Sequence, residues 1–301
     1  MAETFRPNDL SQIYGQDHLL PMLADWSEDP GKIPNCLMLT GPYGCGKTTI
    51  ASILASRLTN CQSDIMDINA ASSRGIDDAR GWAEAARVRP FGKARVFIFD
   101  ELHQMTKDAQ SSLLKVFEKH PPSTYFFLCT TDGGKLLPAL RSRCTPLEVK
   151  LFDLASTQSL LQSLYPGVIT NDVAEKIHLR TGGHARDAVK VADVIKGVGH
   201  YDETALDQTF GISFNQATKI FFEYVANPKA EPYRRTVKAL ESLDRGAGEL
   251  IDGWVDSLVY QNHPQVTVKL SELYQIRALR RRYEITPREA LMHLLTVLYL
   301  P

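Results

Sequence analysis

A glycine-rich segment near the start of the chain has residue types suited to binding phosphate. It follows the pattern G-x-x-x-x-G-K-T between Gly41 and Thr48. Glycines allow the backbone to curl, so that successive N–H groups point at phosphate oxygens. In such a loop Lys47 would neutralise phosphate oxygens, and the Thr48 hydroxyl would be a ligand for Mg²⁺. The motif therefore predicts a nucleotide site formed by Gly41, Pro42, Gly44, Cys45, Gly46, Lys47, Thr48 and Thr49.

The elements on either side of this loop must hold it in place. The apolar run 37–40 can form a buried strand before the loop, and residues 50–58 repeat their apolar positions as a helix does. The helix N-terminus would add partial positive charge beside the phosphates. A glycine-rich turn with a chance lysine is the alternative. A strand before the loop and a helix after it are the context that phosphate binding requires, so they favour the nucleotide site.

Two acidic residues follow the next strongly apolar segment. Residues 95–99 form a continuous β-branched and aromatic run that ends in Asp100 and Glu101. Because ligands bind at the carboxyl ends of parallel strands, Asp100 would hold Mg²⁺, usually through water, and Glu101 would orient and deprotonate an attacking water. Both could instead be helix-capping acids, although the preceding phosphate loop favours the site. His103 has no partner histidines at metal-binding spacing, so we expect it to pack or to face solvent.

Two further segments could complete the site. The apolar strand 125–132 ends in Thr130 and Thr131, whose hydroxyls could sense a γ-phosphate, although a simple polar turn is the alternative. Near the N-terminus, Ile13 and Tyr14 either fill an edge of the core or form an apolar slot for the adenine base. The residues alone leave both alternatives open.

Composition limits the classes of function. A chain of 301 residues allows two or three domains, and 34 lysines and arginines against 35 acidic residues give a net charge of −1. Any nucleic-acid contact must therefore use a local basic surface. No apolar run approaches the length of a membrane span, no signal peptide is recognised, and the five cysteines stand singly without a C-x-x-C pair. We expect a cytoplasmic protein with no membrane partner, zinc ribbon or disulfide framework.

The pattern of elements changes along the chain. Up to about residue 151, apolar strands alternate with helices, which is typical of an α/β fold with a parallel sheet covered on both faces. From residue 152 the apolar spacing is helical, and a glycine turn at 182–183 opens another helix. We therefore predict three domains, at residues 1–151, 152–204 and 205–301. The basic segment 277–282 is most simply a solvated helix face.

With these motifs in order, the chain resembles the ATPase subunits of sliding-clamp loaders, within the AAA+ class. It looks closest to the bacterial and bacteriophage motor subunits. The phosphate loop and the acidic pair are similar to the Walker A and Walker B motifs of that family. The other similar segments are Phe5-Arg6-Pro7 with Ile13-Tyr14-Gly15-Gln16, Thr130-Thr131-Asp132, Ser142-Arg143-Cys144, Gly183-His184-Ala185-Arg186-Asp187-Ala188, and residues 73–80.

The resemblance implies a parallel-sheet P-loop ATPase domain, a small helical lid and a C-terminal all-helical collar. It implies ATP and Mg²⁺ as ligands, with Thr48 and Asp100 at the metal. It implies catalytic roles for Lys47, Asp100, Glu101, Thr131, Arg143 and Arg186, Arg143 acting on a neighbouring subunit's γ-phosphate. The nucleotide would also contact Arg6, Pro7, Ile13, Tyr14 and Arg186, and a DNA backbone would contact Ser73, Arg74, Ile76 and Arg80.

The implied partners are a sliding clamp, other subunits of a loader ring, and primer-template DNA held through its phosphates. Two departures from the family pattern stand out. The cysteines of a zinc module are absent between the phosphate loop and the acidic pair, and the chain stops near the end of the third domain. Both favour a compact, phage-encoded loader subunit.

Two other functions stay open at this point. One is a different AAA+ DNA motor, such as a branch-migration helicase or a helicase loader, which the Ser142-Arg143-Cys144 segment disfavours. The other is a stator subunit that holds a ring without hydrolysing ATP. Such subunits usually lose the lysine or the acidic pair, whereas this chain keeps Lys47, Asp100 and Glu101.

Overall fold

The computed structural model describes residue 5, residues 7–119 and 121–202, and the single residues 205, 206, 209, 275 and 289. Backbone proximity divides the chain into two compact units. One comprises residues 1–178 and 183–193, and the other comprises residues 179–182 and 194–301. The predicted collar and the basic segment 277–282 lie outside the described residues, apart from the single residues named above. The boundaries expected at 151 and 204 stay a prediction.

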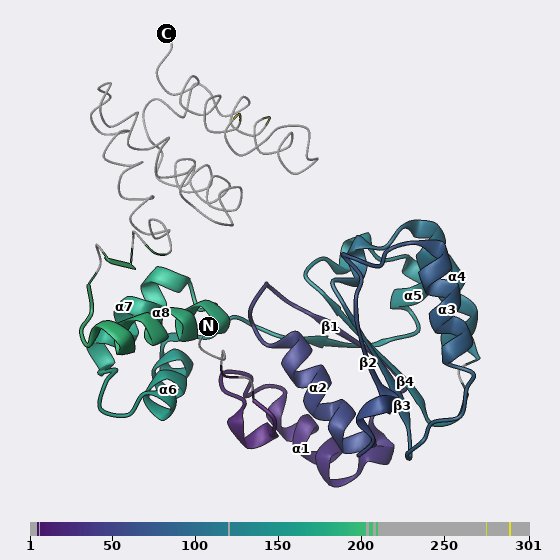
Figure 1. Ribbon diagram of the computed structural model, residues 1–301, viewed down its shortest axis with the longest axis horizontal. Coiled ribbons are helices and arrows are strands. Elements are labelled where there is room, and N and C mark those ends of the chain that lie inside the picture. Colours follow the sequence, from purple (N-terminus) through teal and green to yellow (C-terminus); the bar gives the residue numbers. More distant parts are fainter. Residues whose placement is uncertain are drawn as a thin grey trace. The chain divides into compact units, whose positions relative to one another are not determined.

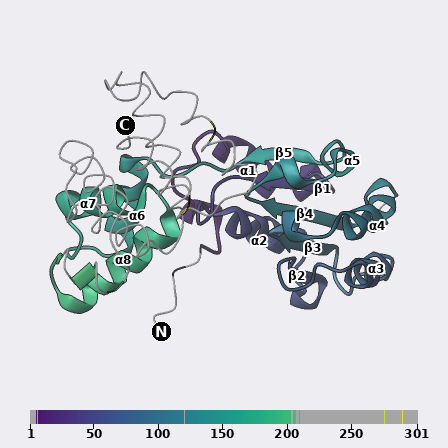
Figure 2. The ribbon, with the colours of Figure 1, turned by 90° about the horizontal axis from the view of Figure 1, so that it is seen from above.

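The first unit is built on a five-stranded sheet in the order β2-β3-β4-β1-β5, and every pairing in it is parallel (Figure 2). This confirms the predicted α/β fold. Thr40 at the end of β1 pairs with Thr130 at the end of β4, so these two strands finish at the same edge. The strands are β1 Cys36–Thr40, β2 Ile65–Asn69, β3 Arg95–Asp100, β4 Thr124–Thr130 and β5 Thr145–Glu148.

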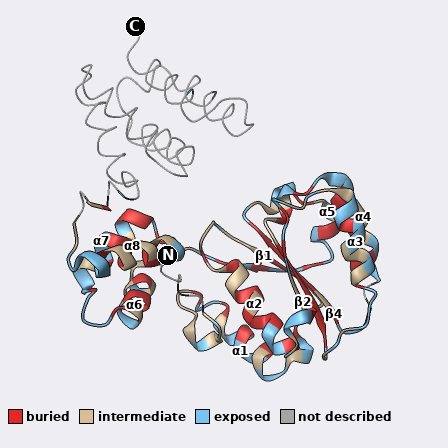
Figure 3. Ribbon diagram, viewed as in Figure 1, coloured by how far each residue is buried: buried red, intermediate tan, exposed pale blue. Residues whose placement is uncertain are grey.

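Helices cover both faces of the sheet (Figures 1 and 3). Helices α1 (Leu20–Glu28) and α2 (Lys47–Leu58) pack on one face. Helices α3 (Ile76–Ala85), α4 (Lys107–Glu118) and α5 (Pro138–Arg141) pack on the other. Successive strand residues point to opposite faces, and both faces are covered. The strands therefore read as unbroken apolar runs.

Residues 152–202 contain three helices, in agreement with the expected helical region. These are α6 Leu154–Leu164, α7 Asn171–Thr181 and α8 Ala185–Val198. In the described part of the chain, no helix combines the length and the apolar character that crossing a membrane would need.

The start of α3 differs from the sequence expectation. The small-polar turn at residues 70–77, with its capping residues, predicts a helix that runs to about Arg87 and carries both Arg74 and Arg80. Instead α3 begins at Ile76 and ends at Ala85. Gly75 is its N-cap, and the Asp78 carboxylate accepts a hydrogen bond from the Gly75 N–H at 3.3 Å. Arg74 therefore precedes the helix.

A buried ion pair joins β3 to the segment before β2. The Asp64 carboxylate lies 3.3 Å from the Arg95 guanidinium, and the two side chains are 0% and 8% exposed. The backbone N–H groups of Phe91 and Gly92 donate to the same carboxylate at 3.0 and 2.6 Å. Burial acts to raise the pKa of Asp64, but these two donors and the Arg95 guanidinium outweigh it and hold that pKa below its ordinary value. The pair thereby fixes the base of the loop that precedes β3.

Replacing Asp64 with asparagine should lower the free energy of unfolding by about 3 kcal/mol at pH 7, because Arg95 is left buried without its counterion. Urea unfolding measures this change. A folded pKa below the unfolded value stabilises the protein above the unfolded pKa, and that contribution is lost as the pH falls through the folded pKa. The difference between wild type and Asp64→Asn should therefore shrink below about pH 4.

The matched control is Asp77→Asn, which removes the surface ion pair between Asp77 and Arg80. The Asp77 side chain is 91% exposed. That change should cost no more than about 0.5 kcal/mol. Equal costs for the two variants would contradict the role assigned to the buried pair.

Candidate nucleotide-binding site

The predicted phosphate loop connects β1 to α2. Two glycines in it have conformations or surroundings that no other residue fits. Gly46 has φ +107°, directly before Lys47 starts the helix. Gly41 has φ +155°, and a Cβ placed there would lie 2.0 Å from the Val149 carbonyl oxygen. The loop can therefore approach the chain that leaves β5 only because residue 41 has no side chain.

Lys47 closes this loop on itself. Its side chain is buried, and its Nζ donates to the carbonyl oxygens of Gly41 at 2.9 Å and Pro42 at 2.7 Å. The buried Cys45 thiol also donates to the Pro42 carbonyl oxygen, at 2.9 Å. Burial raises the pKa of the Cys45 thiol, so this group stays protonated and packs as a small apolar residue. Two backbone carbonyl oxygens of the loop thus hold the Lys47 ammonium in place.

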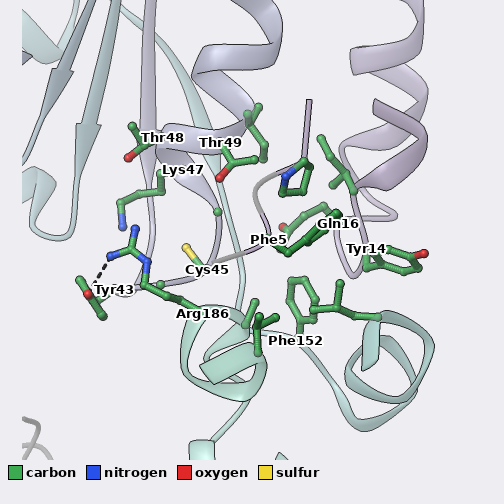
Figure 4. A pocket seen from close by; sticks show the side chains of 18 of the residues that line it. Phe5, Tyr14, Gln16, Tyr43, Cys45, Lys47, Thr48, Thr49, Phe152 and Arg186 are labelled. Atoms are coloured by element: carbon green, nitrogen blue, oxygen red, sulfur yellow. Dashed lines mark hydrogen bonds between the residues drawn. The ribbon is translucent and has the colours of Figure 1, made fainter. Parts of the chain in front are cut away.

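A cavity of about 400 Å³ opens beside the loop (Figure 4). One part of it has polar residues, from Gly44 to Thr49 together with Asp100 and Glu101. The other part is largely apolar, and it includes three of the predicted adenine-side residues. Its lining there comprises Phe5, Pro7, Ile13, Tyr14, Phe152, Leu160 and Val189. A polar end and an apolar end suit a molecule with phosphates and a flat base.

Several lining residues were not expected from the sequence. Phe152, Leu160 and Val189 come from the helical region, and apolar helical spacing gives no sign that a residue faces a ligand. Gln16 stood in the quoted N-terminal motif, but no role was assigned to it. Its buried amide donates to the Lys150 carbonyl oxygen at 2.8 Å and accepts from the Lys150 N–H at 3.0 Å. Gln16 therefore ties the N-terminal segment to the chain after β5.

The acidic pair and the threonines meet at the carboxyl edge of β3 and β4. The Glu101 N–H donates to the Asp100 carboxylate at 3.1 Å, and Glu101 has a left-handed backbone with φ 53° and ψ 41°. The Thr131 hydroxyl donates to Glu101 Oε2 at 3.3 Å. A non-glycine residue in this conformation costs of order 1–3 kcal/mol and persists only where surroundings fix it. Glu101 is therefore held against the threonine that was expected to sense phosphate.

Arg186 reaches the loop from the start of α8. Its guanidinium donates to the Tyr43 hydroxyl at 2.7 Å and lies 4.8 Å from the centre of the Tyr43 ring (Figure 4). Its backbone N–H donates to the Gly44 carbonyl oxygen at 3.3 Å, and His184 Nδ1 lies 2.6 Å from the Tyr43 carbonyl oxygen. Arg186 lines the cavity as expected, whereas the contribution of Tyr43 was not foreseen, because its motif position tolerates any residue.

The other residues predicted to contact the nucleotide or the metal differ in whether they line the cavity. Gly41 and Pro42 do not line the cavity but accept hydrogen bonds from Lys47. Thr48 and Asp100, the predicted metal-site residues, both line it. Arg6 lies outside the described residues.

Arg143 is not brought to this cavity. It lines a separate hollow together with Cys36 and Thr145, which are the first residues of β1 and β5. The hollow is therefore at the amino edge of the sheet, whereas the phosphate loop follows the carboxyl end of β1. The Arg143 guanidinium donates to the Glu118 carboxylate and to the Ala139 carbonyl oxygen.

The predicted DNA-contact residues gather around the start of α3. Arg74 and Arg80 are exposed, and Ser73 and Ile76 are half-buried. Arg80 lies 3.2 Å from the Asp77 carboxylate, and its side chain is 64% exposed. The Arg74 carbonyl oxygen accepts a hydrogen bond from the Thr106 N–H at 3.3 Å, which fixes the backbone before α3.

The fold is shared with solved structures of another protein. Two structures of variants of Thermotoga maritima RuvB align with TM-scores of 0.58 and 0.57. They cover 73% and 96% of this chain, and the aligned shares of those chains are 79% and 88%. Sequence identity is 23% and 20%. These matches show the AAA+ P-loop fold.

Sequence comparisons give more specific relatives. Residues 62–153 match the family described as DNA polymerase III, delta subunit. The DNA polymerase III subunit gamma/tau of Mycobacterium tuberculosis is 31% identical over 216 residues, which are 63% of this chain and 37% of that protein. The replication factor C small subunit of Methanothermobacter thermautotrophicus is 32% identical over 192 residues, 62% of this chain and 56% of that protein.

The chain thus spans only 37% of the length of the gamma/tau relative. The family match over residues 62–153 nevertheless includes the segment from β2 to β5, which carries the acidic pair, the threonines and Arg143. On these matches and motifs, the chain is similar to the AAA+ clamp-loader subunits of the bacterial type.

Proposed function

We propose that this protein is an ATPase subunit of a ring, with five subunits, that opens a sliding clamp and places it on primer-template DNA. Hydrolysis of ATP would release the loaded clamp. The observation that supports this most directly is one cavity that combines the phosphate loop, the Asp100–Glu101 pair and Arg186 with an apolar end. A phosphate cradle beside a water-activating carboxylate is suited to cleaving a nucleoside triphosphate.

The residues of this cavity fit both ATP and Mg²⁺. Lys47 would exchange its carbonyl partners for β- and γ-phosphate oxygens, and the apolar end would receive the adenine. Thr48 and Asp100 would hold Mg²⁺, which would neutralise phosphate charge when bound. Glu101 would accept the proton of the attacking water, while Thr131 would report on the γ-phosphate. Arg186 would contact phosphate from α8, so that the position of this helix would depend on the nucleotide.

Substitutions at Lys47 and Glu101 should separate binding from turnover. Lys47→Ala should weaken ATP affinity about tenfold or more, because it removes a cation from the bound phosphates. Glu101→Gln should bind ATP normally and lose turnover by at least about 100-fold, because the amide cannot accept a proton from water. Calorimetry and steady-state ATPase assays measure the two effects. Equal loss of affinity in both variants would exclude this division of roles.

We also propose that each active site is shared between two subunits. The support is the position of Arg143 at the amino edge of the sheet, away from the phosphate loop of its own chain. An arginine supplied by a neighbour stabilises the charge on the transferring phosphoryl group. Its present partner, Glu118, would be released when the guanidinium reached the neighbour's phosphate.

Arg143→Ala should bind ATP and assemble normally, yet hydrolyse it about 10³-fold more slowly. A mixture with Lys47→Ala subunits is the sharper test, because each variant keeps what the other lacks. Some interfaces of a mixed ring would contain an intact Lys47 and an intact Arg143, so activity should reappear and depend on the mixing ratio. Native mass spectrometry verifies subunit exchange. Exchange without any recovery would rule out the shared site.

The proposed partners would use different surfaces of the chain. Duplex DNA would be held through its phosphates by Arg74 and Arg80, without reading of sequence. A protein partner such as the clamp would suit the loop before β3, where Val88 and Phe91 are 59% and 84% exposed. Exposed apolar side chains on a fixed loop are suited to a protein contact. We place this machinery in the cytoplasm of a bacterium or of a phage-infected cell.

Alanine at both Arg74 and Arg80 should weaken DNA binding equally for unrelated sequences. Each lost phosphate contact should lower the salt slope of log K by about one. Lys32→Ala is a suitable control. Lys32 is exposed, pairs with Asp25 and lies outside α3 and the segment before it. Anisotropy titrations at salt concentrations between about 50 and 200 mM would measure the slopes, because phosphate contacts weaken steeply in this range. An unchanged salt slope in the double variant would show that Arg74 and Arg80 do not contact the DNA phosphates.

For the domain organisation we keep the proposed boundaries 1–151, 152–204 and 205–301, with the last segment as the ring collar. A branch-migration motor is the alternative activity, and the fold likeness to RuvB alone does not favour it. The identity to gamma/tau and replication factor C relatives supports the loader.

A further inference from the structure

His103 lies in the short 3-10 helix Leu102–Gln104, directly after the acidic pair. Its side chain is only 6% exposed, so of the two expected alternatives it packs and does not face solvent. Its surroundings are polar. Nδ1 lies 3.0 Å from Thr130 Oγ1 and 3.3 Å from Glu101 Oε2, and Nε2 lies 3.0 Å from the Gln104 amide nitrogen. Each ring nitrogen of His103 therefore has a defined partner.

These partners decide which nitrogen carries the proton. The Glu101 carboxylate can only accept a hydrogen bond, so His103 Nδ1, which lies 3.3 Å from its Oε2, carries the proton. In a neutral imidazole Nε2 is then an acceptor, which suits the nearby Gln104 amide. The Nδ1–H group donates to the Thr130 hydroxyl, and its positive end lies beside the Glu101 carboxylate.

Two donors then face the same oxygen of Glu101. The Thr131 hydroxyl donates to Oε2, and His103 Nδ1 lies next to that atom. Among the described residues, no hydrogen bond is made to Oε1. The carboxylate is therefore oriented by one oxygen, and the other oxygen is available to accept a proton.

We propose that His103 is a positioning residue for Glu101, through which it acts on the ATPase reaction. The inference rests on the proposed ATPase function. The imidazole would hold Oε2 toward β4, so that Oε1 faces the cavity that Glu101 lines. His103 also bonds Thr130, the neighbour of the phosphate-sensing Thr131, so it links the β4 terminus to the catalytic carboxylate. Misplacing a catalytic group by about 1 Å can cost about 10² in rate.

Two conservative substitutions distinguish the nitrogens. Asparagine places an amide N–H close to the position of Nδ1, whereas glutamine places one close to the position of Nε2. In the assembled complex, His103→Ala should lower kcat about 10²-fold and leave the KM for ATP within about twofold. His103→Asn should recover most of that loss, and His103→Gln should not. A structural role alone predicts no difference between asparagine and glutamine at matched thermal stability.

A second measurement does not depend on turnover. In the ¹⁵N-histidine-labelled full chain, with the His103 signals assigned from His103→Asn, the ring should be the Nδ1–H tautomer. Glu101→Gln should shift the Nδ1 resonance, whereas Asp132→Asn, at a neighbouring half-buried carboxylate that accepts from the Gly134 N–H, should change it less. An Nε2–H tautomer, or a ring insensitive to Glu101→Gln, would overturn the inference whatever the activity.

The kinetic outcomes separate the two proposals. If the wild type showed no turnover, or if turnover survived Lys47→Ala, the proposed ATPase function would be refuted. The tautomer measurement would still test the contact between His103 and Glu101. Normal turnover with an unchanged kcat in His103→Ala would refute the positioning role alone. A parallel loss of ATP affinity, measured by calorimetry, would also refute it.

Discussion

The parallel register of the sheet is the constraint on which the site depends. β4 lies between β1 and β3, and the pairing of Thr40 with Thr130 aligns their carboxyl ends. The phosphate loop, the threonines and the acidic pair each follow one of these three strands. A shift of one residue in this register would turn the strand side chains to the opposite face. Because both faces are packed with large apolar groups, such a shift is strongly opposed.

The sequence was most informative where chemistry and local structure coincide. The phosphate loop, the acidic pair and the sheet type could be predicted, because glycine spacing and apolar runs are local signals. The start of α3 could not, since its N-cap is Gly75, which has no side chain to distinguish it from the polar residues before it. The contacts of Gln16 with Lys150 and of His103 with Thr130 join residues far apart in the chain, so spacing does not reveal them.

The same limit explains why the apolar end of the cavity was only partly foreseen. Ile13 and Tyr14 left two alternatives open, a core edge or a base-binding slot. Ile13 packs against the buried core, and both residues also line the cavity, where Phe152 and Leu160 join them. These residues belong to the chain after the sheet, and their helical spacing would be equally suited to a buried core. Tertiary contacts, and no property of the individual residues, make this surface concave.

The ammonium of Lys47 has a consequence for how strongly a ligand can bind. The Lys47 ammonium donates to the Gly41 and Pro42 carbonyl oxygens, so a phosphate that bound it would compete with them. The measured affinity is then a difference between two sets of contacts, and tight phosphate contacts translate into moderate net affinity. In return, these two hydrogen bonds hold the loop in its curled shape, so a phosphate that bound there would require little further ordering of the backbone.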